Sequence, residues 1–160
     1  MKLIFLDIDG VLNSDNWYYH PEKQRLKYPY DQFDPKLVEL FNKITSKCTK
    51  SIVLTSTWRL NYSIEKMRDI FAEVGIAGNI IDYTPNLKKD TDYVVRGNEI
   101  LKWCKDNEDL LGCKTMDYTD FIILDDNSDM LLWQQKYFFQ TDRLSGLTPT
   151  ITQNVIRQFS

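Results

Sequence analysis

Short, continuously apolar stretches alternate along the chain with longer segments whose apolar residues recur at helical spacing. Residues 3–6 are apolar throughout, which is typical of a strand buried on both faces inside a parallel sheet. Similar short stretches recur further on, and the segments between them carry helix-start signals such as Asp34-Pro35 and Thr148-Pro149. We expect strands at residues 3–6, 51–55, 79–83, 121–124 and 137–139.

The segments between these strands predict helices. In the clearest of them, apolar residues recur every three or four positions from Leu37 to Ile44. Another follows Ser63 and stops at Gly75, a residue that commonly ends helices because it adopts the left-handed conformation without strain. We expect helices that begin near residues 35, 64, 97, 130 and 149.

Three segments lack a regular period. Residues 84–96 and 106–119 are polar connections, and residues 14–33 are irregular and rich in Tyr, Pro and charge. We expect 14–33 to form a long loop or a small hairpin that acts as a flap. No Pro- or Ser-rich linker divides the chain, so residues 1–160 are expected to form a single domain.

Strands that alternate with helices favour an α/β fold. We therefore expect a three-layer sandwich with a mainly parallel, five-stranded, Rossmann-like sheet. In such sheets the carboxyl ends of the strands lie at one edge, where ligands bind. Residues far apart in the sequence would meet there.

The first strand ends in two carboxylates and a glycine, Asp7-Ile8-Asp9-Gly10. Two anions this close repel each other unless a cation or a shared proton offsets them. A polar turn at a strand end is the simpler interpretation. The sharper one is a divalent-metal site, because the second strand ends in Thr55-Ser56 and the fourth in Asp125-Asp126.

Carboxylates at the sheet edge suit a hard cation such as Mg²⁺, which binds a few carboxylates and keeps positions for water and phosphate oxygens. Arg96, at a predicted helix start, would add one positive charge. Zinc is disfavoured because His20 is the only histidine and no Cys/His spacing is present.

Composition narrows the class of protein. The 160 residues carry a net charge of −3, so no global basic field indicates nucleic-acid binding, which would need a local patch. We see no signal peptide and no apolar run long enough to cross a membrane. The three cysteines, Cys48, Cys104 and Cys113, lack CxxC spacing, which favours buried thiols in a reducing, cytoplasmic setting.

The sequence resembles the haloacid dehalogenase (HAD) superfamily of Mg²⁺-dependent, aspartate-based phosphohydrolases. Asp7-Ile8-Asp9-Gly10-Val11-Leu12 is similar to its first motif, Ile52-Val53-Leu54-Thr55 to its second, and Phe121 to Asp126 to its fourth. Thr57-Trp58-Arg59, Arg96-Gly97-Asn98-Glu99-Ile100 and Gly146-Leu147-Thr148 further resemble a small, capless branch whose domain also occurs in RNA-repair proteins.

The resemblance implies roles for the acidic residues. Asp7 would be the nucleophile that forms an aspartyl-phosphate, and Asp9 the general acid and then the general base. The metal would be held by Asp7, Asp9 through its backbone carbonyl, Asp126 and the supporting Asp125. Asp129 would either join the metal site or cap the following helix. An acid at position 9 argues for phosphoryl transfer, since dehalogenase members lack it.

The remaining site residues would contact the phosphoryl group. Thr55 would donate its hydroxyl, although a β-branched residue at a strand end is also ordinary. The third motif normally supplies a Lys, and Arg96 is the candidate here, with Lys88 and Lys89 as rivals and a solvated surface arginine as the simpler interpretation. Three further substrate contacts are expected at Gly10, Ser56 and Arg59.

The gaps between motifs leave no room for a separate cap domain, so the site should be open. Open sites fit bulky substrates, such as a nucleic-acid end or a phosphoprotein. The flap at 14–33 mixes aromatics with Lys23, Arg25 and Lys27, which could stack bases and follow a backbone, or else its aromatics pack on one another. The sequence does not indicate the natural substrate or the oligomeric state.

Two rival functions belong to other classes. A catalytically idle binding module, or a phosphoprotein-interacting domain, could keep the fold. If catalytic activity had been lost, however, Asp7 or Asp9 would be expected to have been replaced, and both are present. A receiver-like signalling domain also uses clustered acids with Thr and Lys. In that class the acid pair precedes the strand of the phosphate acceptor, an order that this chain does not follow.

Overall fold

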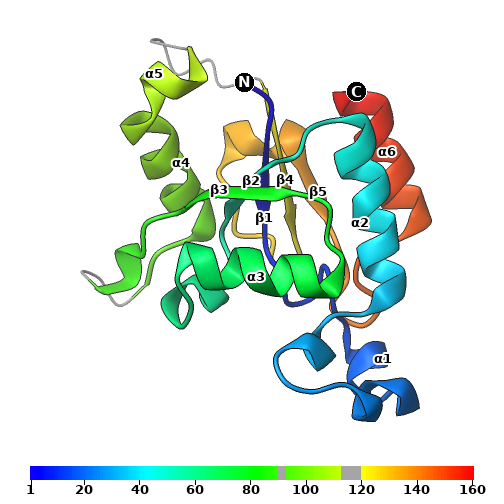
Figure 1. Ribbon diagram of the computed structural model, residues 1–160. Coiled ribbons are helices and arrows are strands. Elements are labelled where there is room, and N and C mark those ends of the chain that lie inside the picture. Colours follow the sequence, from blue (N-terminus) through cyan, green and yellow to red (C-terminus); the bar gives the residue numbers. More distant parts are fainter. Residues whose placement is uncertain (90–92, 113–119) are drawn as a thin grey trace.

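The computed structural model of the chain describes residues 1–89, 93–112 and 120–160, and the fold is built on one sheet of five parallel strands (Figure 1). The spatial order is β3-β2-β1-β4-β5, so the first strand lies in the centre. The α/β class and the parallel five-stranded sheet are as predicted. The strands are β1 (Leu3–Leu6), β2 (Ser51–Leu54), β3 (Asn79–Tyr83), β4 (Phe121–Asp125) and β5 (Phe138–Gln140).

Side chains of β1 alternate between two core layers. Ile4 and Leu6 face one apolar cluster, and Leu3 and Phe5 face the other, all without solvent exposure. This alternation is the two-residue period of a strand, and burial on both faces explains why β1 is apolar at every position.

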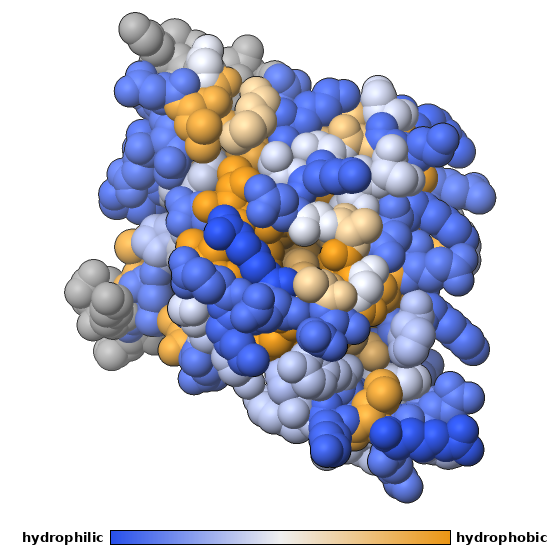
Figure 2. All heavy atoms as spheres, viewed as in Figure 1, coloured by the Kyte–Doolittle hydropathy of each residue, from blue (hydrophilic) through white to orange (hydrophobic). Residues whose placement is uncertain are grey.

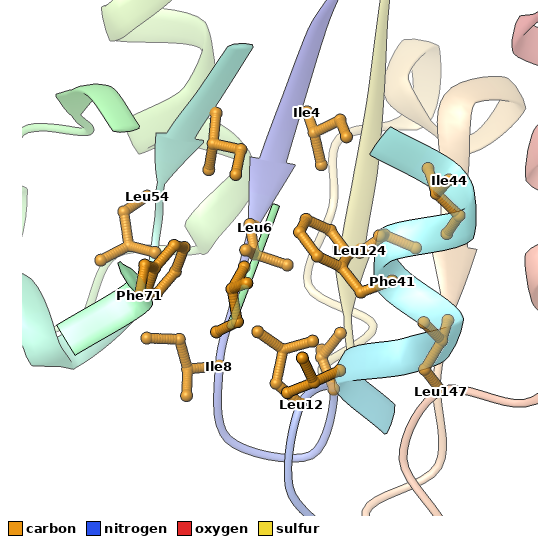
Figure 3. Packing of buried hydrophobic residues seen from close by; sticks show 14 of the residues in the cluster. Ile4, Leu6, Ile8, Leu12, Phe41, Ile44, Leu54, Phe71, Leu124 and Leu147 are labelled. Carbon is orange, nitrogen blue, oxygen red and sulfur yellow. The ribbon is translucent and has the colours of Figure 1, made fainter. Parts of the chain in front are cut away.

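Helices cover both faces of the sheet. The larger cluster packs α2, α3 and α6 against the sheet, as the close view in Figure 3 shows for Phe41, Phe71 and Leu124. The second cluster packs α4 on the opposite face through Ile100 and Trp103. The helices are α1 (Asp15–Tyr18), α2 (Pro35–Lys47), α3 (Ile64–Val74), α4 (Arg96–Asp106), α5 (Glu108–Leu111) and α6 (Pro149–Phe159).

Segment 14–33 is built from short helical turns, which the sequence did not predict. The Ser14 hydroxyl accepts a hydrogen bond from the Trp17 amide and starts α1, and His20 caps a 3-10 turn in the same way. These local side-chain caps replace the loop or hairpin that we expected. The 3-10 turns of the chain are Pro21–Arg25, Tyr30–Gln32, Thr57–Leu60, Leu87–Lys89 and Leu132–Tyr137.

Element boundaries differ from the expectations at two further places. The helix expected at 130–133 is the 3-10 turn Leu132–Tyr137, which moves the start of β5 to Phe138. The connection expected at 106–119 contains α5, and its residues 113–119, with Cys113, lie outside the described part of the chain. Cys48 and Cys104 are free thiols.

The face of the molecule in Figure 2 is mostly hydrophilic, with apolar residues visible mainly through the middle of the view. Within the described residues, no helix has both the length and the apolar character needed to cross a lipid bilayer.

The central packing gives a direct test of the core. Replacing Phe41, which is fully buried against β1, by Ala should lower the free energy of unfolding by roughly 3–5 kcal/mol, because transfer energy is lost and a cavity remains. Urea unfolding would measure the loss. Leu132→Ala, at a position that is 91% exposed, is the control and should change stability by less than about 0.5 kcal/mol. Equal losses in both variants would contradict this packing.

Candidate active site

Three strands end side by side and bring their polar residues together. The Asp7 amide donates to the Leu124 carbonyl at 2.9 Å, and the Thr55 amide donates to the Leu6 carbonyl at 2.9 Å. Each bond extends the sheet ladder by one residue beyond the strand. Asp7 therefore lies between Thr55, which follows β2, and Asp125, which is the last residue of β4.

Asp7 is buried, with 4% of its surface exposed. Burial raises the pKa of its carboxyl, and the charge of Asp9 raises it further, while Arg96, the Ile8 amide and the Ser56 hydroxyl partly offset this rise. The Ile8 amide donates to Oδ1 at 2.8 Å. The donors around Asp7 thus favour its charged form, whereas its burial disfavours it.

Three carboxylates converge at the edge of the sheet. Asp7, Asp125 and Asp126 each offer an oxygen, and these oxygens lie within 4.8 Å of one another. Asp125 is fully buried, and its Oδ2 has no hydrogen-bond partner among the described residues. Burial, with the charge of Asp7, raises the pKa of Asp125 to about 8. A buried, unsatisfied carboxylate oxygen in an all-oxygen donor set fits a hard divalent cation such as Mg²⁺.

Gly10 lets the first loop pass close to Asp126. Its φ of +78° lies in the left-handed region, and a Cβ built there would be 2.6 Å from the Asp126 side chain. The glycine expected to contact substrate therefore also makes room for one of the three clustered acids, and it lines the cleft described below.

Arg96 supplies the positive charge that the acids need. It begins α4, and its Nη1 lies 3.4 Å from Asp7 Oδ1 and 3.3 Å from Asp125 Oδ2. The same nitrogen donates to the Thr55 carbonyl at 2.9 Å and to the Thr55 hydroxyl at 3.1 Å. Among the rival cations, Lys88 is exposed, and the side chain of Lys89 lies outside the described part of the chain.

Asp129 is used as a helix cap, but not of the helix that we expected. Its Oδ2 accepts a hydrogen bond from the Arg96 amide at 2.9 Å, and its carbonyl accepts one from Gly97 at 3.2 Å. Asp129 therefore caps α4, which precedes it in the sequence, and holds Arg96 at the sheet edge.

Arg59 lies beneath the sheet edge rather than free in the cleft. Its Nη2 forms an ion pair with Glu99 at 2.8 Å, and both side chains are nearly inaccessible, with exposures of 5% and 3%. Its other donors reach the carbonyls of Ser56 at 2.9 Å and Thr84 at 3.0 Å, and Nη1 also donates to the Thr55 carbonyl. This network ties the end of β2 to α4.

Ser56, the other expected substrate contact next to Thr55, is also buried. Its hydroxyl accepts a hydrogen bond from the Trp58 amide at 3.4 Å, and it lies near enough to Asp7 to lower the pKa of that carboxyl. Its contact with Asp7 makes Ser56 part of the same cluster of polar side chains.

Asp9 stands apart from the carboxylate cluster. Its side chain is exposed, and its two oxygens accept hydrogen bonds from Asn13 Nδ2 at 2.8 Å and from Trp58 Nε1 at 3.1 Å. The roles of Asn13, Trp58 and Glu99 were not predicted from the sequence. The one available signal was the pair Trp58-Arg59 shortly after the second motif, which makes the contacts with Asp9 and Glu99.

A cleft of about 330 Å³ opens in front of these residues. Asp7, Asp9, Gly10 and Arg96 line its floor, and segment 14–33 forms a wall through side chains that include Tyr18 and Lys23. Lys23 is paired with Asp31 at 2.7 Å and lies 5.3 Å from the centre of the Tyr18 ring. Segment 14–33 thus borders the site. Further lining residues are Asn13, Ser14, Asp15, Trp17, Gln32, Thr57, Asp126, Asn127 and Arg143.

Comparison with known proteins identifies the family of the chain. A family model described as the HAD domain in Swiss Army Knife RNA repair proteins matches residues 3–151. No curated protein matches the chain. The family match includes all three motif strands and the sheet edge where Asp7, Thr55 and Asp125 meet. The resemblance seen in the motifs is thereby confirmed: the chain belongs to the family of HAD domains that occur in Swiss Army Knife RNA repair proteins.

Proposed function

We propose that the chain is a Mg²⁺-dependent phosphatase that cleaves phosphomonoesters through an aspartyl-phosphate on Asp7. The observation that carries the proposal is the grouping of a buried carboxylate with a guanidinium, a hydroxyl and a second carboxylate pair at one sheet edge. Membership of a HAD family supports hydrolase chemistry of the phosphatase type.

Asp7 and Asp9 have separate parts in the proposed reaction. A carboxylate oxygen of Asp7 attacks phosphorus, the new Asp7 O–P bond forms, and the bond from phosphorus to the leaving oxygen breaks. Asp9 gives its proton to that oxygen as it leaves. Water then attacks the phosphorus of the aspartyl-phosphate, Asp9 takes a proton from this water, and phosphate departs with Asp7 regenerated.

Arg96 and Thr55 act on the phosphoryl group. The Arg96 guanidinium offsets the charge of Asp7 and can offer N–H donors to phosphate oxygens, since it carries five in a fixed plane. The Thr55 hydroxyl accepts a hydrogen bond from Arg96, so its own hydrogen is available to a phosphate oxygen. Gly10 and Asn13 border the same space.

The clustered carboxylates suit the metal that the family typically uses. Asp7, Asp125 and Asp126 would hold Mg²⁺, with the Asp9 carbonyl as a further oxygen ligand. The bound ion would neutralise charge on the phosphoryl group and on Asp7. The feature of this chain that supports such a ligand is the buried Oδ2 of Asp125, which has an ion-pair contact with Arg96 but no hydrogen-bond partner among the described residues.

The cleft wall favours a nucleotide or a polynucleotide end as the substrate. Tyr18 is 62% exposed and borders the same cleft as Asp7, with Lys23 and Arg143 beside it. An aromatic ring next to a phosphate site can stack a base, and the family description refers to RNA repair.

The nucleophile is tested by Asp7→Asn. The variant should lose hydrolysis of an aryl phosphate in Mg²⁺ by at least about a thousandfold, because an amide cannot form the acyl-phosphate. Initial rates measure the effect, and mass spectrometry of the rapidly quenched wild type should detect the added phosphoryl group. Asp106→Asn, at an exposed pair with Lys102, is the control. Wild-type protein without turnover on any phosphomonoester, including 5′- and 3′-phosphorylated oligonucleotides, would favour an idle binding module.

The raised pKa of Asp125 predicts how stability depends on pH without metal. Between about pH 4 and 8 the folded chain keeps a proton that the unfolded chain releases, so the free energy of unfolding should fall as pH rises through this window. Mg²⁺ binds the carboxylate form, so it should stabilise the protein more at pH 8 than at pH 5. Urea unfolding in EDTA and in Mg²⁺ measures both slopes.

Two variants sharpen this measurement. Asp125→Asn should flatten the slope in EDTA and weaken the stabilisation by Mg²⁺, whereas Asp106→Asn should keep the wild-type response to Mg²⁺. The metal assignment fails if Mg²⁺ stabilises the wild type and Asp125→Asn to the same extent.

The variant Tyr18→Ala tests whether the Tyr18 ring stacks on a base of the substrate. Loss of one stacked base costs roughly 1–3 kcal/mol, so KM for nucleoside monophosphates should rise about tenfold or more while kcat changes little. KM for glycerol phosphate, which has no base, should stay unchanged. Tyr28→Ala is the matched control, because Tyr28 is 67% exposed but is not among the described residues that line the cleft. Equal KM changes for both substrates would contradict a stacking role.

A further inference from the structure

The carboxylate of Asp9 is held from two sides, although its side chain is exposed. Trp58 Nε1 donates to Oδ2 at 3.1 Å, and Asn13 Nδ2 donates to Oδ1 at 2.8 Å. An exposed aspartate without such partners samples several rotamers. Two donors, one on each oxygen, fix both the direction of the side chain and the plane of its carboxylate.

Trp58 is itself rigidly placed. Its side chain is mostly buried, with 8% of the residue exposed, and its ring lies 5.3 Å from the ring of Phe33 and 5.7 Å from that of Tyr62, measured between centroids. Its amide donates to the Ser56 hydroxyl at 3.4 Å, directly beyond Thr55. The indole N–H therefore reaches Asp9 from a fixed part of the core.

Asn13 is anchored in the loop that carries Asp9. Its Oδ1 accepts a hydrogen bond from the Gly10 amide at 2.9 Å, which orients the side-chain amide so that Nδ2 faces Asp9. The two donors come from different parts of the chain, one from the loop after β1 and one from the turn after β2. They meet only at the Asp9 carboxylate.

We propose that Trp58 is a positioning residue that, with Asn13, sets the Asp9 carboxylate for proton transfer to the leaving oxygen. The inference rests on the proposed function, because it assigns Asp9 the proton transfer described there. The indole N–H is the only side-chain donor of Trp58, and Asp9 accepts it, so Trp58 acts through Asp9 and not on the substrate.

The hydrogen bonds leave Asp9 able to carry the proton. Each carboxylate oxygen has two lone pairs, so an oxygen that accepts one N–H can still bind a proton at its other lone pair. In the first step this proton passes to the leaving oxygen as its bond to phosphorus breaks, and Asp9 becomes a carboxylate. Displacing a catalytic group by about 1 Å can cost a hundredfold in rate, which makes its placement important.

Trp58→Phe removes the indole N–H and keeps an aromatic ring. A leaving group that departs as a stable anion needs little help from a general acid, whereas an alkoxide needs a proton. We therefore expect kcat/KM for an alkyl phosphate to fall roughly tenfold, part of the 10²–10⁴ that a general acid contributes, and kcat/KM for 4-nitrophenyl phosphate to fall less than about threefold. The substrate-dependent loss is the result that a purely structural role would not give.

Trp103→Phe is the matched control. Trp103 Nε1 also donates to an aspartate, Asp82 Oδ2 at 2.7 Å, but it lies in the core layer on the opposite face of the sheet. This variant loses the same kind of hydrogen bond and should lower kcat/KM for both substrates equally or not at all. Thermal unfolding of both variants shows that the assays use folded protein.

Asn13→Ala provides a second test if Trp58→Phe does not fold. It removes the other donor from a partly exposed loop residue and should show the same selective loss for the alkyl phosphate. Equal losses for both substrates, or no loss, in a folded variant would overturn the positioning role and leave the phosphatase assignment intact. A wild type that is inactive on both substrates would overturn both.

Discussion

Asp7 and Asp125 are forced together by the sheet itself, because β1 and β4 are neighbours and end at the same edge. Both carboxyls are buried, and burial raises the pKa of each. Water cannot relieve their repulsion, so the chain must supply positive charge, and Arg96 does so from the start of α4. The position of Arg96 depends in turn on Asp129, whose carboxylate accepts a hydrogen bond from the Arg96 amide. The requirement to neutralise buried like charges thus organises the polar contacts around the edge of the sheet.

Much of this arrangement could be predicted because it follows from local patterns and one topological rule. An apolar run that ends in acids predicts a buried strand with Asp7 at its carboxyl end, and parallel order predicts that Thr55 and Asp125 meet it there. These two steps need only sequence spacing and the right-handed connectivity of parallel strands. Arg96 could be named only as one of three candidate cations, with Lys88 and Lys89, because a place at a helix start does not determine where the side chain points.

The remaining contacts could not be predicted because they join residues that no pattern relates. Trp58 reaches Asp9 across 49 positions of sequence, and Arg59 pairs with Glu99 across 40. A tryptophan or an arginine after a strand has many possible partners, and three-dimensional packing alone selects one. The role of Asp129 could not be predicted for a related reason. A capping residue is normally looked for directly before the helix that it caps, whereas Asp129 caps α4, which comes earlier in the chain.

The buried pair of Arg59 and Glu99 has a consequence for how open the cleft can be. Parallel strands leave carbonyl groups without ladder partners where they end, and water would normally solvate them. Arg59 donates instead to the carbonyls of Thr55, Ser56 and Thr84. The carbonyl groups below the site are therefore satisfied by a buried guanidinium, so the cleft in front of them can stay open without leaving these backbone groups unpaired.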